Sequence, residues 1–305
     1  MESAPQNILT LIIVIQFIFG NLSNGFMVLV NCVDWIKTRK ASSIDKILTI
    51  LATFRIGLIW VTLVYWFGAQ YHSPLLITET PLRIIVSAWI FTNHFSLWFA
   101  TILSIFYLFK IGNFSSPSFL YLKWRIKKVI LMIQLATLIF LFLNLIQMNI
   151  HITDWIHQDE GNATLDSRIS GFSKFSYLAL FTLTMYSLIP FTVALISFCF
   201  LLFSQWKHLQ KMKSNSKEHR DPRTKAHISA IKSVLSFLLL YASFLLCLII
   251  ASIPSIYQNH LAYSVLQSIK MIYLSSHSFI LILGNPKLRQ ACVLMLWQLR
   301  CRLQR

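Results

Sequence analysis

The 305-residue chain is 56% hydrophobic and only 12% charged, which is too little charge to solvate the surface of a soluble protein of this length. Its formal net charge of +17 would suit a nucleic-acid partner only if the basic residues gathered on one folded face. They lie instead in short clusters between long apolar runs, so the composition argues against both classes and predicts an all-α membrane protein.

Seven apolar runs are long enough to cross a bilayer, which takes about 20 helical residues. In chain order they cover residues 3–33, 47–71, 84–109 and 129–150, parts of 175–206 and 233–252, and residues 261–284. The first run is too long for the apolar core of a cleavable signal peptide, so we expect an uncleaved signal-anchor. Pro190 lies inside the fifth run and should kink that helix.

The C-terminal residues 286–305 alternate basic residues with Leu, Met, Val and Trp, which predicts a short amphipathic cytosolic helix against the lipid of the inner leaflet. We therefore expect a seven-transmembrane helix bundle over residues 1–284, followed by this juxtamembrane helix and tail over 285–305. Cys292 and Cys301 lie on the basic stretch and are candidates for palmitoylation. The other three cysteines fall within apolar runs, so no disulfide is expected.

The distribution of Lys and Arg predicts the orientation of the chain in the membrane. Most of the 27 basic residues lie between the first and second, third and fourth, and fifth and sixth spans, or after the seventh. That side should be the cytosol, which places the N-terminus of a plasma-membrane protein outside and its C-terminus inside. Asn162 begins an Asn-Ala-Thr acceptor in an outside loop, so it is a candidate for N-glycosylation.

Strongly polar groups at membrane depth are costly, so each is a functional candidate. Asn24 and Arg55 lie at similar depths in the first and second spans. A hydrogen-bond network around them would either only tie the helices together or also switch between two states, and both interpretations stay open. His277 should be a hydrogen-bonded packing residue, because no second metal ligand stands at a suitable spacing.

The outer half of the third span carries Trp89, Asn93 and Ser96 at helical spacing, so the three share one face. An aromatic ring beside an amide suits small amphipathic ligands, although a Trp can also be an interfacial anchor. In the seventh span Lys270 follows Gln267 by three residues. Lys270 would either extend outward to the interface or line the same pocket and favour anionic ligands.

The sequence offers no catalytic constellation. It contains no pair of intramembrane carboxylates, no phosphate-binding loop and no Cys/His metal pattern, so we predict neither an enzyme nor a metal or cofactor site. A small-molecule transporter is the alternative function. It would be expected to show internal repeats, broken helices and coupling residues at the midplane, and the sequence has none of these.

Several local motifs together resemble one family of receptors. They are Asn24-Gly-Phe, Asn31-Cys-Val-Asp34-Trp, Ser42-Ser-Ile-Asp45, Arg55-Ile-Gly, Asn93-His-Phe-Ser-Leu-Trp98, Phe106-Tyr107, Lys110-Ile-Gly-Asn113, Tyr121-Leu-Lys-Trp-Arg125, Phe237-Leu-Leu-Leu-Tyr241 and the stretch from His277 to Arg289. They span essentially the whole chain, which is thus similar to the type 2 taste receptors, the bitter taste receptors among the G-protein-coupled receptors.

This resemblance implies a receptor for bitter-tasting small molecules that activates a gustducin-type heterotrimeric G protein. It implies a ligand pocket among the outer halves of the third, fifth, sixth and seventh spans, carried over here to Trp89, Asn93, His94, Tyr186, Gln267 and Lys270. Tyr241 matches an aromatic residue of the sixth span that changes rotamer on activation, and it joins Asn24, Arg55 and His277 in the expected activation network.

The resemblance also implies a cytosolic coupling surface, for which Tyr107, Lys110, Lys225 and His227 are the candidates. The acceptor at Asn162 is a further family trait. Phe54 replaces a serine that is usual in the family beside the network.

Overall fold

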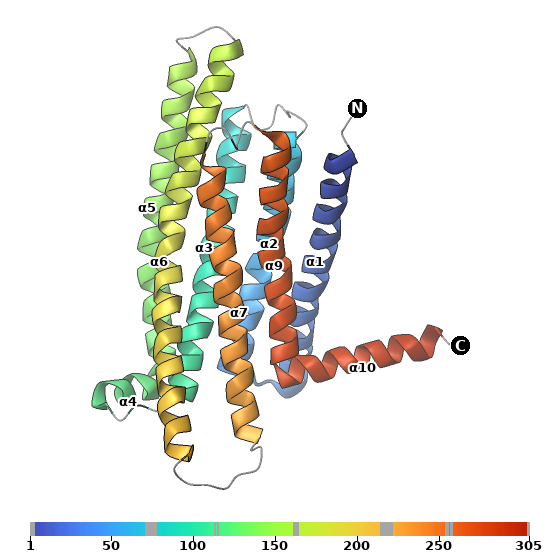
Figure 1. Ribbon diagram of the computed structural model, residues 1–305, viewed down its shortest axis with the longest axis vertical. Helices are drawn as coiled ribbons and strands as arrows, with labels where there is room; N and C mark the ends of the chain where they lie inside the picture. The colour runs from blue at the N-terminus through green and yellow to red at the C-terminus, as the bar shows by residue number, and fades with distance from the viewer. Residues whose placement is uncertain are drawn as a thin grey trace.

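The computed structural model describes residues 4–70, 78–112, 114, 116–160, 165–213, 222–253, 256 and 259–303. These residues form helices and no β-strand: α1 (Ala4–Thr38), α2 (Ser43–Gln70), α3 (Glu79–Ile111), α4 (Pro117–Trp124), α5 (Ile126–Glu160), α6 (Leu165–Lys213), α7 (Pro222–Ala251), α9 (His260–Gly284) and α10 (Pro286–Leu303) (Figure 1). Seven of these helices, all except α4 and α10, are long and apolar enough to cross a membrane. The predicted seven-helix membrane bundle with a short helix after it is confirmed.

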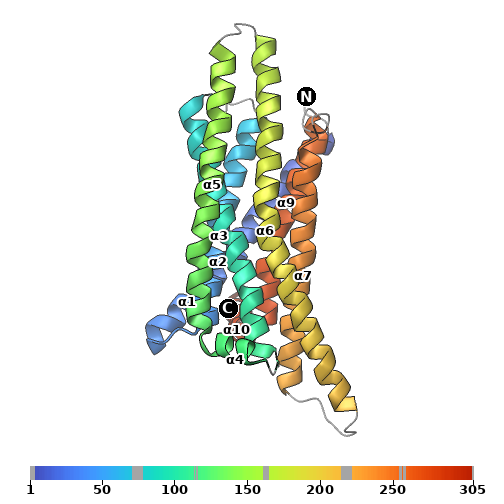
Figure 2. The same cartoon turned by 90° about the vertical axis from the view of Figure 1, so that its left-hand side faces the viewer.

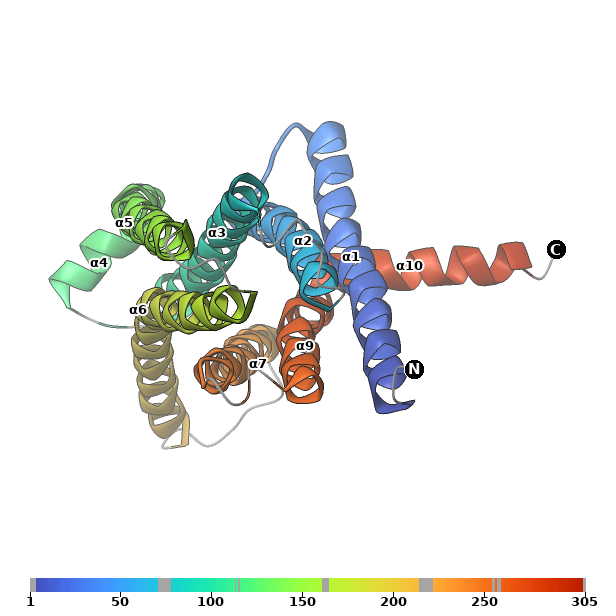
Figure 3. The ribbon, with the colours of Figure 1, turned by 90° about the horizontal axis from the view of Figure 1, so that it is seen from above.

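The seven long helices stand side by side, and α3 runs through the middle of the bundle (Figure 3). α3 contacts α2, α5, α6 and α7, whereas α1 packs against α2 and α9 at one side. We call the end that carries the start of α1 the N-terminal end. The opposite end carries α4, α10 and the Lys/Arg-rich segments, and we call it the basic end (Figure 1). The polar side chains in the middle of α3, Asn93, His94, Ser96, Thr101 and Ser104, are therefore buried against other helices.

One short helix was not expected from the apolar runs, whereas the helix around Pro190 has the expected change of direction (Figure 2). The fourth span was expected to begin at residue 129, and the stretch around Tyr121 before it forms the separate helix α4, which starts at Pro117 and ends at a turn at Arg125. The Lys123 ammonium donates to the Gly112 carbonyl oxygen at 3.1 Å and holds α4 against the end of α3. α6 continues through Pro190 and changes direction along its length (Figure 2).

A charged contact fixes the start of α10 against the bundle. The Lys287 ammonium lies 2.7 Å from an oxygen of Asp34 and 3.3 Å from one of Asp45, so it joins α10 to the end of α1 and the start of α2. Asn285 caps α10 by accepting a hydrogen bond from the Lys287 backbone amide, and Pro286 occupies the first helical position. Partial burial by itself would lower the pKa of Lys287, but its contacts with Asp34 and Asp45 raise that pKa above its usual value.

Replacing Lys287 by methionine should loosen α10 from the bundle. Partly exposed ion pairs contribute about 1 kcal/mol, so amide hydrogen exchange over the first turns of α10 should accelerate roughly fivefold. The raised pKa keeps the lysine charged through neutral pH, and the contact is lost only as the pH rises through that pKa. Arg289→Met removes an exposed cation from the same helix and should leave the exchange unchanged. Equal acceleration in both variants would show that the ion pair does not hold α10.

Candidate functional site

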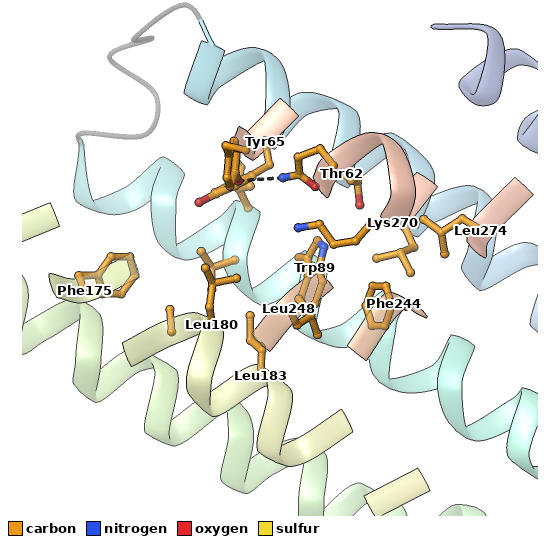
Figure 4. Close-up of a pocket in the computed structure, with 16 residues that line it drawn as sticks. Thr62, Tyr65, Trp89, Phe175, Leu180, Leu183, Phe244, Leu248, Lys270 and Leu274 are labelled. Atoms are coloured by element: carbon orange, nitrogen blue, oxygen red, sulfur yellow. Dashed lines mark hydrogen bonds between the residues drawn. The ribbon is translucent and has the colours of Figure 1, made fainter. Parts of the chain in front are cut away.

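A cavity lies among five helices, α2, α3, α6, α7 and α9, toward the N-terminal end of the bundle. It encloses about 800 Å³, counting the part that is open to solvent. The side chains that line it are Leu58, Thr62, Tyr65, Ile85, Val86, Trp89, Phe175, Ala179, Leu180, Leu183, Phe244, Leu248, Tyr263, Gln267, Lys270 and Leu274 (Figure 4). Most of these are aliphatic or aromatic, with a few polar groups, which is the usual character of a small-molecule site.

Three of the predicted ligand-binding residues line this cavity. Trp89 comes from α3, and Gln267 and Lys270 come from α9. Lys270 is only 7% exposed, and its ammonium lies 5.8 Å from the centre of the Tyr263 ring. Of the two interpretations of Lys270, the structure therefore favours the pocket-lining one over an outward extension to the interface.

The other three predicted ligand-binding residues are not among the lining side chains. Asn93 and His94 are buried one turn further along α3 than Trp89, and the His94 ring lies against Phe95 in an edge-on arrangement. The Tyr186 hydroxyl on α6 donates to the side-chain oxygen of Gln147 on α5, at 3.2 Å. Asn93, His94 and Tyr186 therefore lie outside the wall of this cavity, and their contact with a ligand stays a prediction.

Sequence reasoning also missed part of the lining. Thr62 and Tyr65 bring α2 into the cavity wall, a helix that the expected pocket did not include. Tyr263 precedes Gln267 by four residues and Lys270 by seven, so the three share one face of α9. That spacing would have been sufficient to predict Tyr263. Nothing in the sequence distinguishes the inward-facing residues of α2 from its other polar residues.

The expected network around Arg55 is present and links three helices. Arg55 is completely buried on α2. Its guanidinium donates to the Ser278 hydroxyl at 3.2 Å and to the Tyr273 hydroxyl at 3.4 Å, both on α9. Ser278 in turn donates to the side-chain oxygen of Asn24 on α1 at 2.6 Å. Sequence analysis predicted Arg55 and Asn24 but missed the two α9 hydroxyls that connect them.

An aromatic cluster lies beside this network. The Tyr241 ring of α7 stacks on Tyr273 with 5.9 Å between ring centres, and its hydroxyl donates to the Ser187 carbonyl oxygen of α6 at 2.6 Å. His277 lies 5.1 Å from the Phe237 ring of the same cluster. The Nδ1 atom of His277 is buried and makes no hydrogen bond within the described part of the chain, so the expected hydrogen-bonded packing role stays a prediction.

The predicted coupling and modification residues are placed unevenly. At the basic end Tyr107 is half-buried, and the exposed Lys110 lies with its ammonium 5.6 Å from the centre of the Phe106 ring. Lys225 and His227 belong to α7, and their side chains lie outside the described residues, as does Asn162 altogether. On α10 Cys301 is exposed, whereas Cys292 packs partly buried against the core.

Comparison with known proteins gives one consistent result. The family model described as "Taste receptor protein (TAS2R)" matches residues 1–300. The taste receptor type 2 member 13 of Papio hamadryas is 61% identical over 295 residues, which cover 97% of each chain. The protein of the same name is 59% identical in Homo sapiens over the same share of both chains, and 50% identical in Mus musculus over 99% of both.

Proposed function

Because the chain belongs to the TAS2R family of taste receptors, we propose that it is a G-protein-coupled receptor for bitter-tasting small molecules that activates a gustducin-type G protein. The members of this family are receptors, so membership favours a receptor over an enzyme and over the alternative, a transporter. The observation that carries this proposal is the largely apolar cavity among α2, α3, α6, α7 and α9. Its largely apolar lining with a few polar groups suits a small amphipathic agonist.

The cavity is physically connected to the buried network. Phe244 lines the cavity, and the centre of its ring lies 5.2 Å from that of Tyr273 and 6.3 Å from that of Tyr241. Tyr273 in turn contacts Arg55. An agonist that displaces Phe244 would thus act directly on the contacts between α7 and α9. Such a ligand shifts the population toward the arrangement in which it binds more tightly, with α7 moved outward at its basic end.

The same proposal assigns the two ends of the bundle. The N-terminal end faces the outside of the plasma membrane, where Asn162 carries the glycan, and the basic end faces the cytosol. There Tyr107, Lys110, Lys225 and His227 meet the G protein. α10 lies along the inner leaflet, where its exposed Trp297 enters the lipid and its arginines meet anionic headgroups. The exposed Cys301 is the more accessible of the two palmitoylation candidates.

Calcium release in cells that express this chain with a gustducin-like chimeric G protein tests the function. We expect a dose-dependent response to some members of a panel of bitter compounds. Trp89→Ala should weaken their potency about 10- to 100-fold, because it removes an aromatic wall of the cavity that contributes about 1.5–3 kcal/mol. Trp60→Ala, which removes an indole that is 53% exposed on α2, is the matched control and should keep the response.

The surface delivery of every variant is measured by antibody labelling of intact cells. Equal loss of potency in both tryptophan variants would remove the support for this cavity as the agonist site. Silence of the unaltered chain at the surface, together with uptake of a labelled solute, would establish a transporter instead.

A further inference from the structure

Among the cavity-lining residues that the structure describes, Lys270 carries the only charged side chain. It is 7% exposed, and Figure 4 shows its side chain extending into the lined space. Within the described ranges, ion pairs join Arg83 to Glu79 and Lys287 to Asp34 and Asp45, and none of them reaches Lys270. The ammonium therefore faces an apolar cavity without a protein counter-ion in the described part of the chain.

A buried ammonium without a counter-ion is costly, since removing it from water costs several kcal/mol. The Lys270 ammonium lies 5.8 Å from the centre of the Tyr263 ring, and the attraction between this cation and the ring face offsets only a part of the desolvation cost. An anion held in the cavity would supply the missing charge in surroundings where the attraction is strong. The same lysine would repel a cationic ligand at the same place.

The side chain of Gln267 is a second polar group of the cavity and indicates what else the ligand should carry. The Gln267 side-chain nitrogen donates to the Tyr263 hydroxyl at 2.8 Å. The Gln267 side-chain oxygen is buried and has no hydrogen-bond partner among the described residues. It lies one turn from Lys270 on α9 and is free to accept from a hydroxyl or amide N–H of a ligand. Trp89, Phe175 and Phe244 offer aromatic surface to the remainder.

On these grounds, and resting on the receptor function proposed above, we propose that this cavity selects organic anions. The ligand class is an aromatic carboxylate or sulfonate whose acid group pairs with Lys270, and compounds with an ammonium group are rejected. Lys270 is thus the specificity-determining residue of the site.

Compounds that share one naphthalene ring system and carry a small anionic, neutral or cationic group at the same position test this selection. Cells that express the receptor are challenged with 2-naphthoate and 2-naphthalenesulfonate, with neutral 2-naphthamide and with the cationic 2-naphthylmethylammonium. The unaltered receptor should respond to the anions at least tenfold more potently than to the neutral amide. Lys270→Met should abolish this difference, Lys270→Arg should keep it, and Lys270→Glu should transfer the preference to the ammonium compound.

Lys128→Met removes an exposed lysine from α5 near the basic end and is the matched control. It should leave the preference for anions unchanged. Equal potency of the anionic and neutral compounds on the unaltered receptor would overturn the inference, as would a preference that survives in Lys270→Met.

A measurement without a G protein separates this inference from the proposed function. The detergent-purified receptor is melted with and without each naphthalene compound. Stabilisation by the anions that disappears in Lys270→Met would support the anion site even if the cells give no calcium signal, in which case the receptor function fails alone. A calcium response to bitter compounds without stabilisation by either anion would keep the receptor function and overturn the anion site.

Discussion

Arg55→Ala is expected to abolish signalling and to lower the amount of receptor at the cell surface severalfold. The guanidinium makes two hydrogen bonds to the hydroxyls of Ser278 and Tyr273. Bonds to a charged group contribute about 1.5–3 kcal/mol each, so the alanine variant should lose roughly 3 kcal/mol or more of the contact between α2 and α9. The Arg55 side chain is completely buried, so its truncation to alanine also leaves a cavity in the packed interior. Surface labelling and calcium release in the same cells measure both effects.

Two further variants distinguish a static tie from a switch, the interpretations that the sequence left open. Arg55→Met fills most of the space with an apolar chain and removes a costly buried charge, so it should restore surface delivery. If the network also switches, Arg55→Met should still lose the agonist response at least tenfold. Ser278→Ala removes the link to Asn24 and one of the two guanidinium bonds, but it keeps the bond from Arg55 to Tyr273 and should weaken the response by less. An Arg55→Met receptor with normal potency would show that the network only ties the helices together.

The membrane spans could be predicted almost completely from the sequence, because the length of an apolar run and the density of charge decide them. Helix ends beyond the hydrocarbon could not, since polar residues continue a helix as readily as they end it. α5 was expected to end at residue 150 and reaches Glu160. α4 was missed because a helix of eight residues in a basic segment has no apolar signal of its own.

The candidate site was predictable in part, for a related reason. The position of Arg55 and Lys270 within apolar spans identified them as candidates, because a charged side chain inside the membrane is costly unless it is paired or has a function. It could not show that Ser278 and Tyr273 are the partners of Arg55, because serine and tyrosine are common in such helices. For the other predicted site residues, the rotation of each helix about its axis determines whether the side chain faces the cavity, and the sequence does not specify this rotation. Tyr186 lies about one turn beyond the lining residue Leu183, and its hydroxyl bonds to Gln147 on α5.

Tyr241→Ala is expected to be the most damaging change outside the Arg55 network. The side chain is completely buried at the junction of α6, α7 and α9. Its ring contacts Phe191 at 5.1 Å and Phe237 at 5.4 Å between ring centres, in addition to Tyr273. Removing a large buried aromatic ring costs about 3–5 kcal/mol in a packed interior. We expect a receptor that melts several degrees lower in detergent and gives no calcium response.

Tyr241→Phe separates the hydroxyl from the ring. It keeps the aromatic contacts but loses the 2.6 Å hydrogen bond to the Ser187 carbonyl oxygen, which lies one turn before Pro190. A neutral hydrogen bond contributes about 1 kcal/mol, so this bond biases the position of α7 against α6 by about fivefold in population. Agonist potency or basal activity should therefore shift by about fivefold, with little change in melting temperature. If Tyr241→Phe melts as low as Tyr241→Ala, the hydroxyl serves the stability of the bundle rather than the setting of the switch. If it instead signals with unaltered potency and basal level, α6 and α7 move together, and the change between receptor states must lie at the contact of α7 with α9.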